Sequence, residues 1–342
     1  MADILTAMNR KKQILKHVNQ RGRGIEIGPW INPIAPKREG FDCLTLDVFD
    51  TATLRSRAAG DPNIAALAHQ IEEVDLVGSS TEIENITRAT CPELEFDYVV
   101  SSHNFEHLPN PIRFLQGCTR ILKPGGVIAM AIPDHRACFD YFRPVTRLGE
   151  WLDSYHRKLD RPSLSHYFDH RYAFAYHAPT ANTSALRTES PSGWKGPGDL
   201  REAYADWLRR MQEGESEYLD SHVSVFTPSS FELLIHDCVF LGLLSLKTIE
   251  ILDADTEFHA SLQVMAQPEL ADPQAHRVKR DALMQSIREE EAEASIRYRE
   301  VVAQLDATRA KLDAARLAID ALRASRSWRL TAPLRWLGAR LR

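Results

Sequence analysis

Cysteine is scarce in this sequence, and its cysteines form no metal-binding or disulfide pattern. There are five, an odd number, and they lie far apart without a Cys-x-x-Cys pair. This spacing argues against a zinc ribbon and for a reducing compartment. We expect all five to be buried thiols: Cys43, Cys91, Cys118, Cys138 and Cys238.

Long apolar runs are also missing. No stretch approaches the roughly 18 to 20 uncharged apolar residues that cross a bilayer, and Met1 to Lys16 lacks the apolar core of a signal peptide. The sequence therefore predicts a cytoplasmic protein.

Positive charge is concentrated at one end of the chain. The 342 residues carry a net charge of −5, with 44% apolar and 26% charged residues, as in a soluble globular protein. Residues 325–342 hold five arginines and no acid, so removing their +5 leaves −10 for the rest. An acidic body argues against nucleic acid as a partner, because phosphate binding uses a basic face.

Short apolar runs alternate with helical stretches over the first part of the chain. The predicted strands are Gly24 to Ile27, Cys43 to Val48, Val74 to Val77, Phe96 to Ser101 and Val127 to Ile132. The predicted helices are Ile4 to Val18, Ile64 to Gln70 and Ile112 to Leu122, the last ended by Lys123-Pro124-Gly125-Gly126. Strict alternation predicts an α/β fold with a parallel sheet.

One further helix and two strands are predicted near the end of this region. Thr227 and Pro228 suit the cap and first position of a helix that runs to about Cys238. Leu244 to Leu252 and Phe258 to Ala266 follow, joined by a short Asp-rich turn. The Rossmann-like sheet is therefore expected to have seven strands and to end in an antiparallel hairpin.

The first two predicted strands end in the pattern of a nucleoside site. Gly28 follows the first strand, and Asp47 ends the second about 20 residues later. In such sites, a glycine lets the backbone approach the ligand and an acid accepts hydrogen bonds from ribose hydroxyls. A single glycine disfavours NAD or FAD, and an ordinary turn with an exposed acid would show the same pattern.

A longer pattern follows in the next part of the chain. The sequence reads FDYVV at 96–100, EHL at 106–108 and RILKPGG at 120–126. This order resembles the methyltransferase type 11 group of class I S-adenosylmethionine-dependent methyltransferases. The resemblance covers residues 24–134 and, more faintly, 227–266. It implies the methyltransferase fold, methyl transfer, and S-adenosylmethionine as the cofactor.

The resemblance also implies which residues bind the cofactor. Glu26 and Gly28 would flank its methionine part, and Asp47 would bind the ribose hydroxyls. The turn Val77 to Thr81 would lie beside the adenine. The full implied set is Glu26, Gly28, Pro29, Asp47, Ser79, Ser80, Ser101, Ser102 and His103.

Methyl transfer depends more on protein groups that position the two substrates than on protein groups that react with them. It proceeds by in-line displacement, and a histidine can take the proton of a hydroxyl acceptor. His103 and the pair Asp134 and His135 lie at the carboxyl ends of strands four and five, where open α/β sheets bind ligands. We predict His103, His135 and Asp134 as catalytic. The alternative is that His103 and His107 only cap or pack the following helix.

An insertion rich in aromatic residues and histidines separates strand five from the Thr227 helix. Residues 136–226 would overhang the acceptor side of the cofactor, so we predict a substrate lid for a sizeable acceptor. His166 and His170 have the i, i+4 spacing of a helical metal pair, but no third ligand is specified. Packing or substrate contact is favoured, and no metal site is predicted.

Residues 275–324 have the composition of a long helix. They contain no Gly or Pro and almost no aromatic residue. One heptad seam comprises Val301, Leu305, Thr308, Leu312, Ala315, Ile319 and Leu322, with Ile287, Ala294 and Tyr298 upstream and with Glu291 and Thr308 as imperfect members. This predicts a homo-oligomeric coiled coil, with a single solvated helix lying on the domain as the alternative.

The final segment, residues 325–342, is basic and amphipathic. Trp328, Trp336 and several leucines lie among its arginines, which suits an anionic membrane face. The stretch SRSWRLTAPLR also resembles the ends of bacterial glycosyltransferases and methyltransferases of surface-polysaccharide assembly. The alternative is an arginine-rich tail that binds nothing in particular, or binds nucleic acid nonspecifically.

These features together predict a methyltransferase domain over residues 1–270, a coiled-coil helix over 275–324 and a membrane-associated tail over 325–342. The expected activity is O-methylation of a sugar or glycan intermediate in bacterial envelope polysaccharide synthesis, at the inner membrane surface. One alternative is a methyltransferase for another small molecule or a protein. The other is a non-catalytic coiled-coil scaffold, because Pro29 and Trp30 stand where the family often has glycines.

Overall fold

The chain divides into two units, Met1–Glu291 and Ala292–Arg342. The computed structural model describes residues 2–185, 187, 193–196, 199–214, 219–266, 272–325, 328, 330 and 332. The first unit contains the whole central sheet, and the second contains the later part of the long C-terminal helix.

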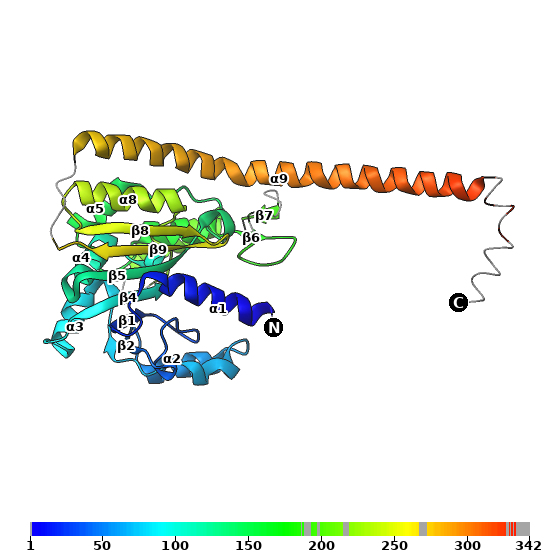
Figure 1. Ribbon diagram of the computed structural model, residues 1–342. Helices are drawn as coiled ribbons and strands as arrows, with labels where there is room; N and C mark the ends of the chain where they lie inside the picture. The colour runs from blue at the N-terminus through cyan, green and yellow to red at the C-terminus, as the bar shows by residue number, and fades with distance from the viewer. Residues whose placement is uncertain are drawn as a thin grey trace. The chain divides into compact units, whose positions relative to one another are not determined.

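The first unit is built on a seven-stranded sheet (Figure 1). Its strands are β1 Arg23–Ile27, β2 Asp42–Asp47, β3 Leu76–Val77, β4 Phe96–Ser102, β5 Leu122–Pro133, β8 Leu246–Asp253 and β9 Glu257–Val264. The order is β3-β2-β1-β4-β5-β9-β8, and β9 runs antiparallel to both of its neighbours. The predicted α/β sheet and its terminal hairpin are therefore confirmed.

Helices cover the sheet and connect its strands. They are α1 Ala2–Ile14, α2 Thr51–Gly60, α3 Ile83–Thr90, α4 Pro111–Ile121, α5 Leu148–His156, α6 Leu164–Ala173, α7 Leu200–Glu213, α8 Pro228–Phe240 and α9 Pro273–Ala324. Two short strands in the insertion, β6 Tyr176–His177 and β7 Trp194–Lys195, form a separate antiparallel pair. Thr227 caps α8 as predicted, since its side chain accepts from the Ser230 N–H.

The crossover between β2 and β3 differs from the prediction. Residues Ala65–Gln70 form a 3-10 helix, and the α-helix of this crossover is α2, which Asp50 caps. The sequence pattern missed α2 because only Thr51, Leu54 and Ala58 of this helix are buried, too few for a clear apolar periodicity.

Two hydrophobic clusters lie on opposite faces of the sheet. Successive side chains of a strand point to opposite faces. In β4, Val99 belongs to the larger cluster, which includes Phe105, whereas Tyr98 and Val100 belong to the cluster that packs α1. Gly24 of β1 lies against Tyr98, and a Cβ there would come within 1.9 Å of the ring. Close packing of these two strands therefore requires glycine.

The cysteines are free, as expected, but they are not all buried. Cys43, Cys118, Cys138 and Cys238 are buried, and Cys91 is only partly so. Cys91 is the residue that follows α3, where the chain turns back toward β4 at the surface. The prediction of a buried thiol is wrong for this residue.

The C-terminal helix α9 begins as part of the first unit. His276 and Arg280 contact the carboxylate of Asp237 on α8 at 2.9 and 3.1 Å. Glu291 lies 2.9 Å from the Nε2 of His135, which accounts for an acid in the predicted apolar seam. The first unit, which ends at Glu291, thus includes the start of α9.

Within the second unit, the seam residues Val301, Leu305, Leu312, Ile319 and Leu322 are exposed in the single chain. Residues 325–342, the predicted basic tail, lie almost entirely outside the described residues. Among the helices that the structure describes, none is long and apolar enough to cross a membrane.

Candidate active site

A cavity of about 610 Å³ opens at the carboxyl ends of the first four strands. It is lined by Ile27, Gly28, Leu46, Asp47, Val48, Phe49, Arg57, Gly78, Ser80, His103, Asn104, His107 and Asp220. The strand order reverses between β1 and β4, and open α/β sheets bind ligands at such a switch point. The volume is within the range of small-molecule sites, about 300 to 1,000 Å³.

Gly28 allows a ligand to approach the backbone after β1. Its φ is +58°, and its N–H donates to the carbonyl of Leu46 at 2.9 Å. A Cβ on Gly28 would meet no atom within 4 Å. The position therefore combines a left-handed turn with open space above the backbone.

Asp47 ends β2 with its carboxylate at the cavity. Its Oδ1 accepts the N–H of Phe49 at 3.1 Å. Partial burial raises the pKa of Asp47 above its ordinary value, while the Phe49 N–H and the charge of Arg57 oppose this rise. A carboxylate in this place can accept hydrogen bonds from two adjacent hydroxyl groups.

Asn104 is a cavity residue that sequence reasoning missed. Its Oδ1 lies 3.5 Å from the hydroxyl of Ser80, and its Nδ2 is buried without a hydrogen-bond partner among the described residues. A buried amide donor without a partner is expensive unless a ligand supplies an acceptor. Asn104 lies inside the motif at 96–108, but nothing in its spacing distinguishes it from the neighbouring polar residues.

His103 lines the same cavity with a strained backbone. It has a φ of +52°, which is uncommon for a residue with a side chain. Its Nε2 lies 2.9 Å from Glu257, and its Nδ1 lies 3.6 Å from Glu106. Burial alone would lower the pKa of His103, but the two carboxylates outweigh burial and raise it.

The other residues of the predicted cofactor set do not line the cavity. Glu26 is 3% exposed and accepts the N–H groups of Ile34 and Ala35 at 2.5 and 2.8 Å, so it holds the loop after β1. Burial raises the pKa of Glu26 to about 7.

Several of the remaining residues of the predicted cofactor set form polar contacts outside the cavity. The Pro29 carbonyl accepts the Asn32 N–H, the Ser79 side chain caps a 3-10 turn, and Ser102 accepts from Arg10. Ser101 is buried within β4. Of the predicted set, the cavity therefore brings together Gly28, Asp47, Ser80 and His103.

Asp134 and His135 lie outside this lining. Asp134 is fully buried and bound by Arg136, whose Nε lies 2.9 Å from Oδ1. The His135 ring contacts Glu291 of α9. Both residues directly follow β5. Their placement gives no support to a catalytic role, which stays a prediction.

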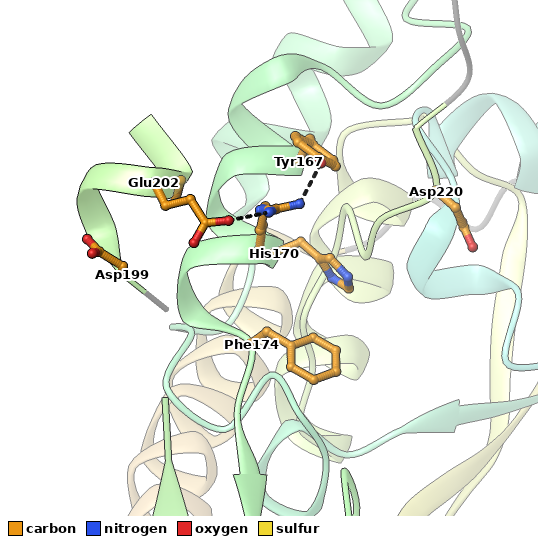
Figure 2. A pocket seen from close by; sticks show the side chains of 8 residues that line it. Tyr167, His170, Phe174, Asp199, Glu202 and Asp220 are labelled. Carbon is orange, nitrogen blue, oxygen red and sulfur yellow. Dashed lines mark hydrogen bonds and ion pairs between the residues drawn. The ribbon is translucent and has the colours of Figure 1, made fainter. Parts of the chain in front are cut away.

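A second cavity, of about 430 Å³, lies within the insertion (Figure 2). It is lined by Tyr167, His170, Arg171, Phe174, Asp199, Glu202, Ala203 and Asp220, mostly from α6 and α7. Arg171 donates to the Tyr167 hydroxyl at 3.2 Å and pairs with Glu202 at 3.5 Å. Asp220 lines both cavities, which makes them neighbours.

The carboxylate of Glu257 contacts three basic side chains near the cavity, and its ionisation makes these contacts depend on pH. Arg10, His103 and His259 contact its carboxylate at 2.6, 2.9 and 2.8 Å. Burial would raise the pKa of Glu257, but these partners hold it well below the ordinary 4.5. Because the folded pKa is below the unfolded one, the ionised carboxylate stabilises the fold above about pH 4.5, and this contribution is lost as the pH falls.

We therefore expect Glu257→Gln to unfold at a lower temperature than wild type at neutral pH, and the difference to shrink as the pH falls below about 4.5. Thermal melts followed by circular dichroism across this range measure the effect. The exposed Glu95→Gln is the matched control and should follow wild type throughout. A constant difference between Glu257→Gln and wild type would contradict the expectation.

Comparison with known proteins identifies the class of this domain. The family model described as "Methyltransferase domain" matches residues 8–238, more than half of the chain. The chain belongs to this methyltransferase family. It is an S-adenosylmethionine-dependent methyltransferase, and S-adenosylmethionine is its cofactor.

Solved structures of similar proteins include other methyltransferases. The CcbJ methyltransferase from Streptomyces caelestis has 12% identity and a TM-score of 0.38, with 76% of this chain and 95% of that chain covered. A methyltransferase from Mesorhizobium loti has 12% identity and a TM-score of 0.36, covering 75% and 96%. A putative sarcosine dimethylglycine methyltransferase from Galdieria sulphuraria has 16% identity and a TM-score of 0.32, covering 77% and 86%. No curated protein matches the sequence.

The residues present in the larger cavity fit this cofactor. The open space above Gly28 admits a ligand close to the backbone, and the carboxylate of Asp47 suits ribose hydroxyls. The buried Nδ2 of Asn104 supplies a hydrogen-bond donor for a ligand acceptor. Gly28, Asp47 and Asn104 lie at the ends of different strands, β1, β2 and β4, and all three line the same cavity.

Proposed function

We propose that this methyltransferase methylates an oxygen of a sugar or glycan intermediate in bacterial envelope polysaccharide synthesis. The observation that carries the proposal is the second cavity, which shares Asp220 with the cofactor cavity. An acceptor in the second cavity would lie beside the cofactor, as transfer between two bound molecules requires.

The lining of the second cavity suits a polyhydroxylated ring. Tyr167 and Phe174 provide aromatic surfaces that pack on the apolar face of a sugar. The carboxylates of Asp199, Glu202 and Asp220 accept hydrogen bonds from hydroxyl groups. α6 and α7 supply most of these side chains, which supports the predicted role of residues 136–226 as a substrate lid.

When bound, S-adenosylmethionine supplies an electrophilic methyl group on a sulfonium sulfur. The chain's own contribution is to position the acceptor and to remove its proton. His103 is the residue best placed for proton removal, because it lines the cofactor cavity and Glu257 fixes its Nε2.

The test is methyl transfer to a panel of nucleotide sugars and lipid-linked glycans, followed by measuring S-adenosylhomocysteine. With the preferred acceptor, we expect Glu202→Gln to raise the acceptor KM about 10-fold, as for one lost charged hydrogen bond, and to leave the affinity for S-adenosylmethionine unchanged. Glu213→Gln, on the same helix but outside the cavity lining, should behave as wild type.

Equal acceptor KM values for wild type and Glu202→Gln would remove the second cavity from the acceptor site. Turnover with a non-carbohydrate small molecule or a protein, and none with the glycan panel, would support the alternative hypothesis that the acceptor is another small molecule or a protein.

We further propose that α9 joins copies of the chain. The seam residues Leu305, Leu312 and Ile319 are about half exposed in the single chain, with exposed fractions of 50, 51 and 47%. Their heptad spacing would bury them against the same helix of a second copy. The basic tail at 325–342 would then hold the assembly at the inner membrane surface.

We expect the full chain to be oligomeric and the triple variant Leu305→Asn, Leu312→Asn, Ile319→Asn to be monomeric by light scattering after size exclusion. Leu317→Asn is the matched control, since Leu317 is 71% exposed and lies off the seam. A monomeric wild type, or a triple variant that keeps the oligomer, would contradict this part of the proposal.

A further inference from the structure

Glu106 is a buried carboxylate whose oxygens have no hydrogen-bond partner among the described residues. The residue is 1% exposed and lies in the 3-10 turn Phe105–His107, directly after β4. Removing an ionised carboxylate from water is costly unless a cation or donors compensate. The position therefore favours a cation or hydrogen-bond donors beside the carboxylate.

Three histidines lie near this carboxylate, and the Nδ1 of His103 is 3.6 Å from Oε1. The Nε2 atoms of His107 and His222 each lie 3.9 Å from Glu106 Oε1. One ligand atom from each of Glu106, His107 and His222 falls within 4.8 Å of the other two. At 3.9 Å, neither of these two imidazoles is hydrogen-bonded to the carboxylate, so the three side chains surround a common space.

The other ring nitrogen of each histidine is held by a second carboxylate. His107 Nδ1 lies 2.8 Å from Asp220, and His222 Nδ1 contacts Asp140. Arg143 fixes Asp140 in turn at 2.7 Å. A carboxylate on Nδ1 orients the ring and directs the Nε2 lone pair away from itself, as in the second shell of histidine metal sites. Here both Nε2 atoms lie on the side of Glu106, 3.9 Å from its Oε1.

The backbone holds the distant segments together. The N–H groups of Val223 and Ser224 both donate to the carbonyl of Glu106, at 2.7 and 3.0 Å. His222 is therefore fixed opposite Glu106 although the two are far apart in sequence. The backbone therefore holds Glu106 and His222 together, whereas His107 is oriented by the exposed side chain of Asp220.

We propose that Glu106, His107 and His222 bind a divalent transition-metal ion, with Zn²⁺ as the best match. Two imidazoles and one carboxylate are a common protein ligand set for catalytic zinc, and they leave a fourth position open. Tetrahedral zinc ligands lie about 3.3 Å apart, so closing around an ion would shorten each 3.9 Å pair by about 0.6 Å and the widest pair by at most about 1.5 Å.

The position of the cluster indicates what the open coordination site would take. His107 lines the cofactor cavity, and Asp220, which holds His107, lines both cavities. An oxygen of the acceptor would bind the ion where the two cavities meet. This last step rests on the proposed function, whereas metal binding itself does not.

The test begins with the untagged full-length wild-type chain and its metal content by plasma mass spectrometry. After chelation, Co²⁺ is titrated while its visible absorption and the unfolding temperature are followed. We expect one ion per chain, a saturable cobalt spectrum, and a higher unfolding temperature with Zn²⁺ or Co²⁺ than after chelation.

Glu106→Gln and His222→Gln should weaken cobalt binding at least 10-fold. His166→Gln, a histidine of the same insertion outside the cluster, should bind cobalt as wild type does. The wild-type unfolding temperature requires no variant and stays decisive if Glu106→Gln fails to fold.

A folded wild type that binds neither ion, with no metal-dependent change in unfolding temperature, would overturn the proposal and leave the histidines as proton-carrying partners of Glu106. Calorimetry with S-adenosylmethionine on the chelated chain keeps the two hypotheses apart. If the chain binds the cofactor but no metal ion, only the proposal of a metal site fails. If it binds a metal ion but methylates no acceptor of the panel, only the proposed acceptor class fails.

Discussion

Replacing Asp47 with alanine is expected to weaken S-adenosylmethionine binding by about 100-fold or more. The Asp47 carboxylate lies at the end of β2 and lines the cofactor cavity. Each hydrogen bond to a charged group contributes about 1.5 to 3 kcal/mol, and two ribose hydroxyls would lose theirs together. Titration calorimetry with S-adenosylmethionine and S-adenosylhomocysteine measures the loss.

A matched control is available on the same strand. Asp42 begins β2 at the opposite end of the sheet, is exposed and pairs with Arg23. Asp42→Ala should bind the cofactor as wild type does. Wild-type affinity in Asp47→Ala would place the ribose elsewhere, and absence of binding by folded wild type would favour the scaffold interpretation of the domain.

Replacing Phe105 with alanine is expected to have the largest effect on stability. Phe105 is fully buried, and its ring lies 5.4 to 6.1 Å from the rings of Phe114, Trp151, Phe226 and Phe231. Removing a buried phenylalanine ring costs about 3 to 5 kcal/mol, because transfer energy is lost and a cavity remains. Urea unfolding followed by circular dichroism measures this difference.

Phe142→Ala provides the comparison, because Phe142 is 52% exposed and should cost less than about 1 kcal/mol. Similar unfolding midpoints for the two variants would show that the aromatic cluster around Phe105 repacks. The same ring holds the turn that carries Glu106, so Phe105→Ala should also weaken any metal bound there.

The two functional cavities depend on different parts of the chain. Much of the cofactor cavity is built from residues at or just after the ends of strands, which is why a short pattern near Gly28 and Asp47 indicates it. The second cavity is built from α6, α7 and the segment near Asp220. Its residue pattern fits an ordinary small hydrophobic core equally well, and only the packing of the insertion shows that a cavity remains.

Sequence by itself determined the alternation of strands and helices, the terminal hairpin, and the glycine and acid of the cofactor site. These features depend on local physics: a strand has a period of two, a helix ends before Lys123-Pro124-Gly125-Gly126, and a turn at Gly28 needs a left-handed backbone. The long helix α9 was predicted for the same reason, because composition alone favours it.

Only the tertiary structure decided which titratable groups meet. His103 and His135 both follow sheet strands, yet one lines the cavity and the other contacts α9. Glu106 and His222 are separated by more than a hundred residues and come together through the carbonyl of Glu106. Such contacts depend on long-range packing, which leaves no periodic signal in a single sequence, so the candidate metal cluster was visible only in the folded chain.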